Sequence, residues 1–343
     1  MTAQTDVGYH AIQHGRWRAS EIAFWILALA SAFLFPSRYL IMTDIVRLAL
    51  FALSLDLILG YAGIVSLGHA AFFGVGAYSA GLLALHGIVT EPVIALVVAG
   101  LVATAVGFLT SFLVIRGVDL TRLMVTLGIA LLLEALAERF SNITGGTDGL
   151  QGIEMQPILG LFAFDMFGKV GFFYSLGVLF VLFLLARRIV HSPFGLSLRA
   201  IRNNPLRAAA IGIPVNRRLI AVYTLAAFYA GIAGALFTQT TALASLDVFS
   251  FERSADLMLV LVIGGTGYLY GGLIGAVVFK MLQEVFSTIT PQYWQFWIGL
   301  VLVVIVLVGR ARMHRWALWA PNLIIRQFGG RKTIVAVPES DPS

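Results

Sequence analysis

The stretch RRIVHSPFGLSLRAIRNNPLRAAAIGIPVNRR, residues 187–218, holds seven arginines and no acidic residue. Long apolar runs flank it, LGVLFVLFLLA (176–186) before it and LIAVYTLAAFYAGIAGALF (219–237) after it. A membrane-spanning helix needs about 20 mostly apolar residues, so these runs are typical of membrane helices. A basic, proline-containing stretch between two such helices must lie at a membrane surface. We name residues 187–218 the basic loop and expect it to fix orientation, to bind a partner, or both.

The composition of the whole chain is that of a membrane protein. Of its 343 residues, 59% are hydrophobic and 12% are charged, and the mean hydropathy is +0.92. Its 35 glycines fit this class, because small residues let membrane helices approach closely. The absence of cysteine excludes disulfides and thiolate metal sites. Cytoplasmic loops explain the net charge of +6, so we expect no nucleic-acid partner and contact mainly with membrane lipid.

Ten apolar segments are candidates for membrane helices. They are residues 22–35, 45–59, 67–85, 93–115, 120–140, 170–189, 219–241, 257–264, 268–288 and 294–308. The first and the eighth are short for a full span, and the first follows a polar start without a small-residue cleavage site, so we expect it to be retained. The sequence predicts an all-α, polytopic membrane protein with about 8–10 transmembrane segments.

The distribution of basic residues predicts the orientation of these segments. Arginines gather at the N-terminus, at Arg116 and Arg122, in the basic loop and in the C-terminal tail, which we therefore expect to be cytoplasmic. The connections around Glu91, at residues 142–169 and at residues 242–256 should face outward. We expect a cytoplasmic tail (1–20), a transmembrane domain (21–310) and a second cytoplasmic tail (311–343).

Two glycine clusters interrupt the apolar pattern. They read GYAGIVSLGHAAFFGVGAYSAG (60–81) and GGTGYLYGGLIG (264–275), and we expect each to turn a helical hairpin that starts and ends outside. Interrupted helices at matching places in two halves are typical of a transport path, although the glycines could equally serve close helix packing. The predicted path residues are Gly63, Ser66, Gly68, His69, Gly264, Gly265, Thr266, Gly267 and Glu134.

Motifs for catalysis and metal binding are not found in the sequence. No G-x-x-x-x-G-K-[ST], H-E-x-x-H or G-x-S-x-G occurs, so we predict no catalytic residue and no metal site. His69 stands alone and is better explained as a packed, hydrogen-bonded histidine than as a ligand. If the protein uses ATP, another subunit must bind it.

Ionisable residues within the apolar segments suggest function, because charge is costly in hydrocarbon. Those that we place at membrane depth are Asp56, Glu134, Glu138, Lys280 and Glu284. We expect Glu138 to lie at the outer membrane interface, which explains its charge. Glu134 is deeper, and a role in the path or in pairing helices stays open. Together with Asp56, it supports an alternative function, namely a secondary transporter of a small polar solute coupled to protons or sodium.

The basic loop also contains the signals of a short helix. Asn204 is a suitable N-cap, Pro205 suits the first helical position, and Gly212 followed by Pro214 ends the helix. A loop that only fixes the orientation of the membrane helices needs arginines, but it does not need a capped helix. We therefore predict a helix of about two turns that docks a soluble partner.

These motifs together resemble one family. LSLDLILGYAGIVSLGHAAFFGVGAY (53–78), TGGTDGL (144–150), SPFGLSLRAIRNNPLRAAAIGI (192–213) and VIGGTGYLYGGLIGA (262–276) are similar to permeases of ABC transporters of the branched-chain amino acid type, the LivM-like subunits. The resemblance implies a bacterial or archaeal inner membrane and a second, homologous permease in a heterodimer. It also implies two cytoplasmic ATPases that hold ATP and Mg, a periplasmic solute-binding protein, and no cofactor on this chain.

The resemblance further implies that residues 203–212 form the helix that docks in a groove of an ATPase. The predicted coupling residues are Arg199, Arg202, Asn203, Asn204, Pro205, Leu206, Arg207 and Gly212. Family members usually carry acidic residues near positions 204 and 205, and this loop has none, which indicates a dedicated ATPase partner. The family also includes importers of urea, short amides and aromatic acids, so the substrate stays open, as does a scaffold without transport activity.

Overall fold

The computed structural model describes residues 19–117, 119–165 and 167–308. The chain forms two compact units, Met1–Leu282 and Gln283–Ser343, which are described separately below. Its helices are α2 (Ala19–Leu34), α3 (Tyr39–Ala62), α4 (Ala70–Leu85), α5 (Pro92–Arg116), α6 (Asp119–Arg139), α7 (Ser141–Thr144), η1 (Gly146–Asp148), α8 (Lys169–Val190), α9 (Pro193–Asn203), α10 (Pro205–Ala210), α11 (Val215–Thr241), η2 (Leu246–Phe249), α12 (Phe251–Gly264), α13 (Leu269–Ile289) and α14 (Trp294–Val308).

The predicted all-α membrane architecture is confirmed. Each of the ten apolar segments coincides with a helix, and the described residues contain isolated β-bridges but no strand. Among the described residues, six helices are long and apolar enough to cross a membrane, and three more apolar helices are shorter, α2, α4 and α14. The predicted tails lie almost wholly outside the described residues.

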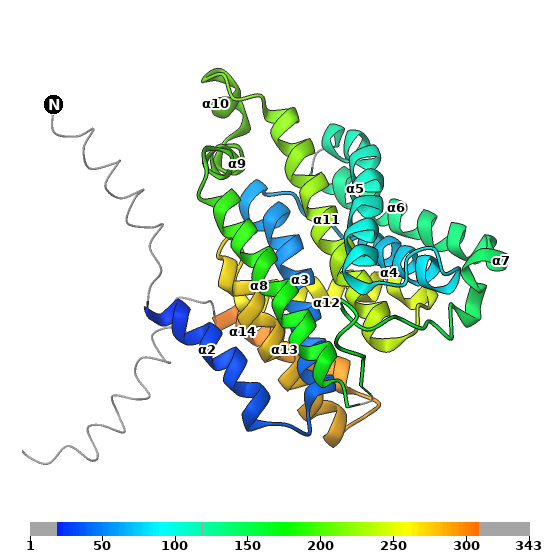
Figure 1. The fold of residues 1–343 in the computed structure, drawn as a ribbon. Helices are drawn as coiled ribbons and strands as arrows, with labels where there is room; N and C mark the ends of the chain where they lie inside the picture. Colours follow the sequence, from blue (N-terminus) through cyan, green and yellow to red (C-terminus); the bar gives the residue numbers. More distant parts are fainter. Residues whose placement is uncertain (1–18, 118, 166, 309–343) are drawn as a thin grey trace, which may run out of the picture. The chain divides into compact units, whose positions relative to one another are not determined.

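Helix α11 is the centre of the first unit, where it packs against α3, α4 and α5 (Figure 1). Small residues make this packing possible. A side chain on Gly234 would meet the Phe73 carbonyl of α4 at 1.8 Å, and one on Gly76 would meet the Gly231 carbonyl at 2.0 Å. The buried Tyr229 hydroxyl donates to the Leu182 carbonyl at 2.9 Å, which ties α11 to α8. Close glycine contacts thus build the core, as in other membrane bundles.

Both predicted glycine interruptions are present. Helix α3 ends at Ala62, and Gly63 follows in the left-handed conformation with φ of 73°. The chain stays non-helical until α4 begins at Ala70, three residues later than the apolar pattern indicated. Helices α12 and α13 are separated by residues 265–268. We name residues 63–69 the first break and residues 265–268 the second break.

The connections predicted to face outward lie together. Leu150 and Ala244 exchange backbone hydrogen bonds of 2.7 and 3.1 Å, and the Gln156 N–H donates to the Thr90 carbonyl at 3.0 Å. Three connections far apart in sequence therefore meet at one end of the first unit. The basic loop, the end of α5 and the start of α6 lie at the opposite end (Figure 1). This division agrees with the side assignments that the charge pattern predicts.

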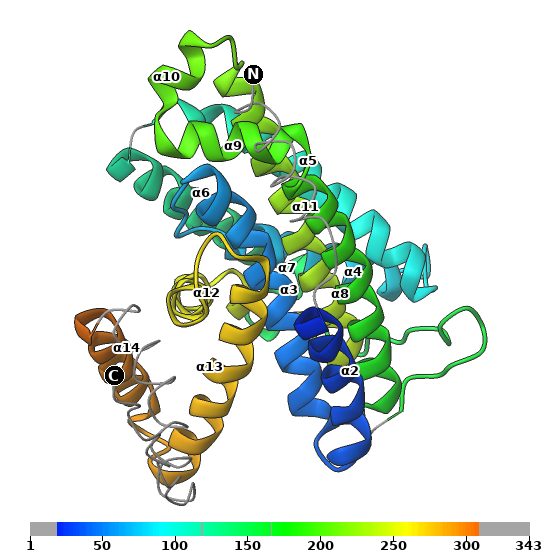
Figure 2. The ribbon, with the colours of Figure 1, turned by 90° about the vertical axis from the view of Figure 1, so that its left-hand side faces the viewer.

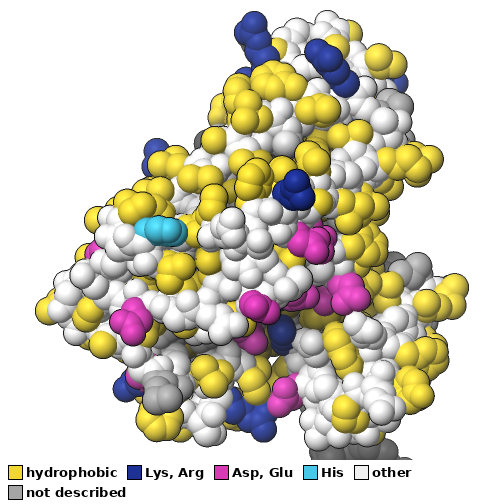
Figure 3. All heavy atoms as spheres, turned by 90° about the vertical axis from the view of Figure 1, so that its right-hand side faces the viewer, with side chains coloured by type: hydrophobic (Ala, Val, Ile, Leu, Met, Phe, Trp, Pro, Cys, Tyr) yellow, Lys and Arg dark blue, Asp and Glu magenta, His cyan; other side chains and the backbone are white. Residues whose placement is uncertain are grey.

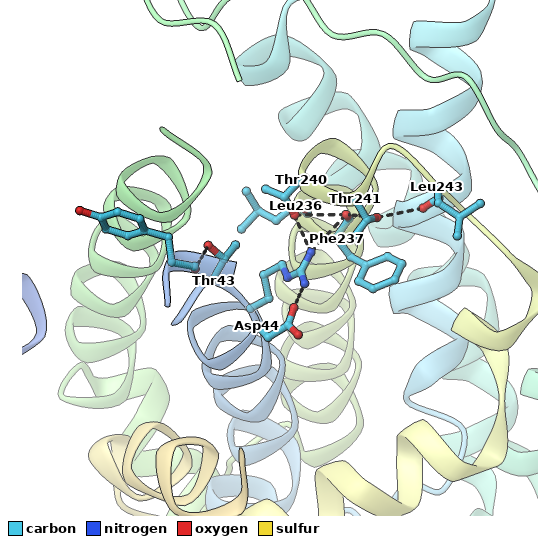
Figure 4. A network of polar contacts seen from close by, with 9 residues as sticks. Thr43, Asp44, Leu236, Phe237, Thr240, Thr241 and Leu243 are labelled. Carbon is cyan, nitrogen blue, oxygen red and sulfur yellow. Dashed lines mark hydrogen bonds and ion pairs between the residues drawn. The ribbon is translucent and has the colours of Figure 1, made fainter. Parts of the chain in front are cut away.

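Arg47 is a buried cation within α3 that the sequence analysis did not single out. Its guanidinium pairs with Asp44 and donates to the Thr240 hydroxyl at 2.5 Å (Figure 4). Two cations lie close to the Phe237 ring, with the guanidinium carbons of Arg47 and Arg253 at 5.0 and 4.9 Å from its centroid. Such cation–π contacts join α3, α11 and α12 near the outward connections.

Surface helices of the first unit expose apolar side chains, as expected where lipid or another membrane subunit covers them. On α6, the residues Met124, Leu131 and Leu132 are all exposed. Figure 3, seen from the side of α6 and α7, shows hydrophobic side chains across much of the face. In the second unit, the rings of Phe286 and Trp297 stack with centroids 6.2 Å apart, which joins the end of α13 to α14.

The basic loop contains two helices, of which one was predicted. Helix α10 matches the expected helix, but α9 was missed. Helix α9 starts with the same signals, because the Ser192 hydroxyl accepts from the Phe194 N–H at 3.2 Å and Pro193 occupies its first turn. Arg187 is more than an orientation signal, since it forms a 2.9 Å ion pair with Glu21 and so joins α8 to α2.

Candidate coupling and translocation site

The two breaks contact each other at the end of α3. Asp56 is fully buried, and its Oδ1 accepts a hydrogen bond of 2.7 Å from the N–H of Gly267 in the second break. A side chain on Gly60 would lie 2.4 Å from the same nitrogen, so only glycine allows the approach. Figure 2 shows the turn between α12 and α13 beside this end of α3. Residues 211 positions apart in sequence therefore form one junction.

Neighbouring helices hold the first break. The first N–H groups of α4 lack a cap from the preceding side chain, and the Ser254 hydroxyl of α12 instead accepts from the Ala70 N–H at 3.0 Å. On the other side, the Thr126 hydroxyl of α6 accepts from the Leu67 N–H at 3.2 Å. A side chain on Gly68 would meet the Thr126 carbonyl at 1.7 Å. The break is thus packed between α6 and α12, and one hydroxyl from each of these helices accepts an N–H group in the break or at its end.

His69 is packed, in agreement with the interpretation preferred from the sequence. It is 0% exposed, its Nε2 lies 2.8 Å from the Ser54 hydroxyl, and its ring stacks on Phe51. Ser66 in the same break is also fully buried. In this conformation neither side chain faces open space, so a role in the path would require the break to move.

The basic loop contacts this junction directly. Arg202 of α9 donates from Nη1 to the Gly60 carbonyl, and a side chain on Gly267 would meet the same Nη1 at 2.9 Å. Arg199 lies over the ring of Tyr61, with its guanidinium carbon 5.3 Å from the ring centroid. These two predicted coupling residues therefore contact the transmembrane helices themselves.

The tip of the basic loop presents a different surface. Leu206 and Ile211 are 83% and 75% exposed, whereas Ala208 between them is buried. Asn204 caps α10 as predicted, because its Oδ1 accepts from the Arg207 N–H at 3.0 Å. Exposed aliphatic residues on a capped helix beside an arginine are typical of a surface that binds another protein.

Glu134 lies apart from the junction. It is half-buried on α6, eight residues beyond Thr126, which corresponds to about 12 Å along a helix. The other predicted path residues all lie in or beside the two breaks. The structure thus brings together the glycine, serine and histidine residues of the prediction, but not Glu134.

Comparison with known proteins gives the family. Residues 38–306 match the family described as the branched-chain amino acid transport system / permease component. The chain belongs to this permease family. The match includes both breaks, the basic loop and, among the described residues, every helix of the first unit except α2. The chain is accordingly a multi-pass protein of the plasma membrane. It spans a little under two thirds of the length of the LivM relatives that it matches.

Individual relatives of the permease differ in what their names say they carry. It is 27% identical to the high-affinity branched-chain amino acid transport system permease protein LivM of Escherichia coli over 279 residues, which are 74% of this chain and 64% of that protein. It is 28% identical over 254 residues to a probable LivH of Methanocaldococcus jannaschii, covering 70% and 77% of the two chains. It is 30% identical over 171 residues to the ribose import permease RbsC of Bacillus subtilis, covering 46% and 53%. No solved structure matches the chain.

Proposed function

We propose that this permease and a second, homologous permease form the translocation path of an ATP-binding-cassette importer for branched-chain or related amino acids. Two cytoplasmic ATPases bind ATP and Mg, and a periplasmic binding protein delivers the solute. The named substrates of LivM and LivH support the amino-acid assignment. The chain itself binds no cofactor in this proposal.

The continuous contact from the loop tip to the breaks is the observation that carries the coupling role. Leu206 of α10 and Ile211, which follows the helix, are both exposed and provide a surface for an ATPase. Helix α10 packs on α9, and Arg202 of α9 is bonded to Gly60 beside the Asp56–Gly267 contact. A displacement of the tip therefore reaches both breaks through directly bonded groups.

The proposed mechanism follows from these contacts. Closure of the ATPases moves α10, and α9 moves with it because the two helices are packed together. Arg202 then shifts relative to Gly60, which changes how the two breaks fit against each other. Because broken helices pivot where their backbone is not helical, the helices on either side of the breaks tilt. The path then opens alternately to the outside and to the cytoplasm.

Uptake in proteoliposomes tests this function. The permease, its partner permease and the ATPases are reconstituted with ATP inside, and labelled leucine is supplied with the binding protein outside. Uptake should require ATP and survive an ionophore. Uptake without ATP that collapses with the ionophore would instead establish an ion-coupled carrier. Uptake by vesicles that lack the permease would assign it a scaffold role.

Charge reversal at the loop tip tests the docking role. Arg207→Glu should abolish co-purification of the ATPases while membrane insertion stays intact, because Arg207 is exposed on α10. The matched control is Arg217→Glu, an exposed arginine at the start of α11. Wild-type amounts of ATPase on the Arg207→Glu variant would contradict the docking assignment.

The ligand of the associated binding protein decides the substrate. Thermal shift of that protein against branched-chain amino acids, urea, short amides, aromatic acids and ribose separates the alternatives. The sugar enters this set because a ribose permease is among the relatives. Stabilisation by leucine, isoleucine or valine supports the proposal, and stabilisation by another class alone replaces its substrate.

A further inference from the structure

A short apolar turn, residues 157–162, lies in the outward connection between η1 and α8. It reads PILGLF, and no charged residue occurs from position 155 to position 164. Leu159, Leu161 and Phe162 are 70%, 77% and 60% exposed, whereas Ile158 is buried and anchors the turn. A group of exposed apolar side chains in one place often marks a surface that binds another molecule. We name residues 157–162 the apolar turn.

The backbone N–H groups of the apolar turn all have acceptors within the chain. Four of them donate to carbonyl groups of the turn itself at 2.8–3.3 Å, those of Ile158, Gly160, Leu161 and Phe162. The Leu159 N–H donates to Oε1 of Glu91 at 3.3 Å, and Pro157 has no N–H to satisfy. Water can satisfy the N–H groups of an ordinary surface turn. A turn that enters lipid must satisfy them internally, because no water is available there.

Glu91 holds the apolar turn beside the outer end of α5. Its Oε2 accepts from the Ile94 N–H at 2.7 Å and so caps α5, while its Oε1 accepts from Leu159. Ile94 and Val97, in the first two turns of α5, have exposed aliphatic side chains. The apolar turn is therefore fixed at the level where the exposed aliphatic surface of this membrane helix begins.

Leu159 has a backbone conformation that is unfavourable for leucine. Its φ is 52°, in the left-handed region that glycine, asparagine and aspartate adopt more readily. In water an asparagine would suit this position better, since an exposed leucine gains nothing there. An apolar side chain is favourable at this position if it leaves water when the protein is in its membrane. The leucine therefore indicates an apolar environment around the turn.

The direction in which the turn extends identifies that environment. Figure 2 shows the loop that leads into α8 extending to the side of the first unit, beyond its helices. Lipid surrounds a membrane protein at its sides, whereas a soluble protein approaches from the outer end of the bundle. The absence of charged side chains from the turn also favours lipid, because the surface that a soluble protein presents is largely polar.

We propose that the apolar turn inserts into the outer leaflet of the membrane. Leu159, Leu161 and Phe162 enter the boundary between the headgroups and the acyl chains, where apolar side chains of interfacial segments are buried. Glu91 holds the turn at that depth through the Leu159 N–H. The turn thereby anchors the outward connection before α8 to the lipid surface.

Quenching by labelled lipids measures the depth of the turn. The chain has no cysteine, so Leu161→Cys accepts a single environment-sensitive fluorophore. The labelled full-length permease is reconstituted with its partner permease and the ATPases in vesicles of phosphatidylethanolamine and phosphatidylglycerol. These lipids carry a nitroxide either near the top or near the end of one acyl chain. The controls are Gln151→Cys, at an exposed position of the same connection, and Leu101→Cys, at an exposed position within α5.

The expected result is shallow insertion. Interfacial segments reach only about 5–10 Å into the boundary, so the shallow nitroxide should quench position 161 about threefold more than position 151. It should also quench position 161 more than the deep nitroxide does. The Leu101→Cys control should be quenched strongly by the deep nitroxide, because a position within a membrane helix lies in the hydrocarbon.

A second substitution separates insertion from folding. Leu159→Asn, combined with Leu161→Cys, should lower the quenching by the shallow nitroxide to about half or less, because a polar side chain replaces an inserted leucine. The melting temperature of this variant should not fall, since asparagine adopts the left-handed conformation more readily than leucine.

Three results would overturn the anchor. Quenching at position 161 no stronger than at position 151 would place the turn in water. A fluorescence change at position 161 that needs the purified solute-binding protein, without quenching by lipid, would make the turn a docking surface for that protein instead. Undiminished quenching in a folded Leu159→Asn variant would contradict insertion of the left-handed leucine.

Discussion

Asp56 shows how a single residue can serve architecture rather than chemistry. Its buried carboxylate accepts the Gly267 N–H, and the bond connects two halves of the chain. An ion-coupled carrier would need this acid to gain and lose a proton. A structural acceptor needs only an oxygen at the same position. The two roles therefore predict different behaviour for the isosteric amide.

Substitution of Asp56 separates the two roles. Asp56→Asn keeps an oxygen opposite Gly267 and should retain most ATP-driven uptake, within about threefold. Asp56→Ala leaves the Gly267 N–H without an acceptor, which costs about 1–3 kcal/mol, and should lower both the melting temperature and uptake. Uptake by purified, reconstituted complexes gives the measurement. If the amide variant loses uptake as completely as the alanine variant, the carboxyl group does more than accept a bond.

Gly60 gives a second test at the same junction. Alanine stabilises a helix interior by roughly 1 kcal/mol relative to glycine, so Gly60→Ala would ordinarily be favourable. Here the new methyl group would meet Asp56 Oδ1 at 2.1 Å and the Gly267 nitrogen at 2.4 Å. Gly60→Ala should therefore lower thermal stability and abolish uptake. Gly128→Ala on α6, where nothing lies within 4 Å, should be neutral or stabilising. Equal effects of both variants would contradict the close junction.

The residues of this site could be predicted from the sequence, but the contacts between them could not. Asp56 and the glycines of both clusters stood out, because acids and glycines in apolar segments are unusual. The sequence contains no distances, so it could not show that Asp56 bonds to Gly267. Nor could it show that Arg202 bonds to the Gly60 carbonyl while Leu206 has no such contact with the transmembrane helices. The acceptor role of Ser254 left no signal, because an isolated serine in a membrane helix is common.

At the scale of elements, α10 is stabilised mainly by its ends. It has only six residues, and a helix this short depends on capping and on its packing against α9. Asn204 supplies the cap, and Pro205 fixes the first backbone angle. The coupling role requires that the tip moves as a rigid body.

Removal of the cap should loosen the tip. Asn204→Ala should cost about 1 kcal/mol of helix stability and reduce solute uptake per ATP hydrolysed, because a frayed helix transmits less of the ATPase motion. Asn216→Ala, an exposed asparagine at the start of α11, serves as the control. Both rates are measured in the same proteoliposomes. An unchanged ratio in Asn204→Ala would show that the cap is dispensable for coupling.

Elements were easier to predict than their packing. All ten apolar segments coincide with helices, because each is rich in residues that only a membrane or a core accommodates. Helix α9 was missed because three of its eleven residues, Pro193, Arg199 and Arg202, resemble the surrounding loop. Its Ser-Pro start was the available signal, the same kind that located α10. The placement of α11 at the centre could not be predicted, since several other segments are equally apolar.

At the scale of the whole molecule, the orientation in the membrane can be tested by labelling introduced cysteines, because no native thiol reacts. The chain has no cysteine, so a single introduced thiol reports one position. Arg207→Cys should react with a membrane-impermeant maleimide only after the cytoplasmic side is opened. Gln151→Cys, in an exposed outward connection, should react in intact cells. The reverse pattern would invert the predicted topology.

The Asp56–Gly267 bond also constrains the order of biosynthesis. The two partners are 211 residues apart. At about 5–20 residues per second, the ribosome needs roughly 10–40 s to make the second partner after the first. During that interval the Asp56 carboxylate of α3 lacks its hydrogen-bond donor, the Gly267 N–H. An ionisable group without a partner is costly in hydrocarbon. The newly made first half must therefore stay hydrated or shielded until α12 and the second break arrive, so the insertion of this protein is completed late, by its C-terminal third.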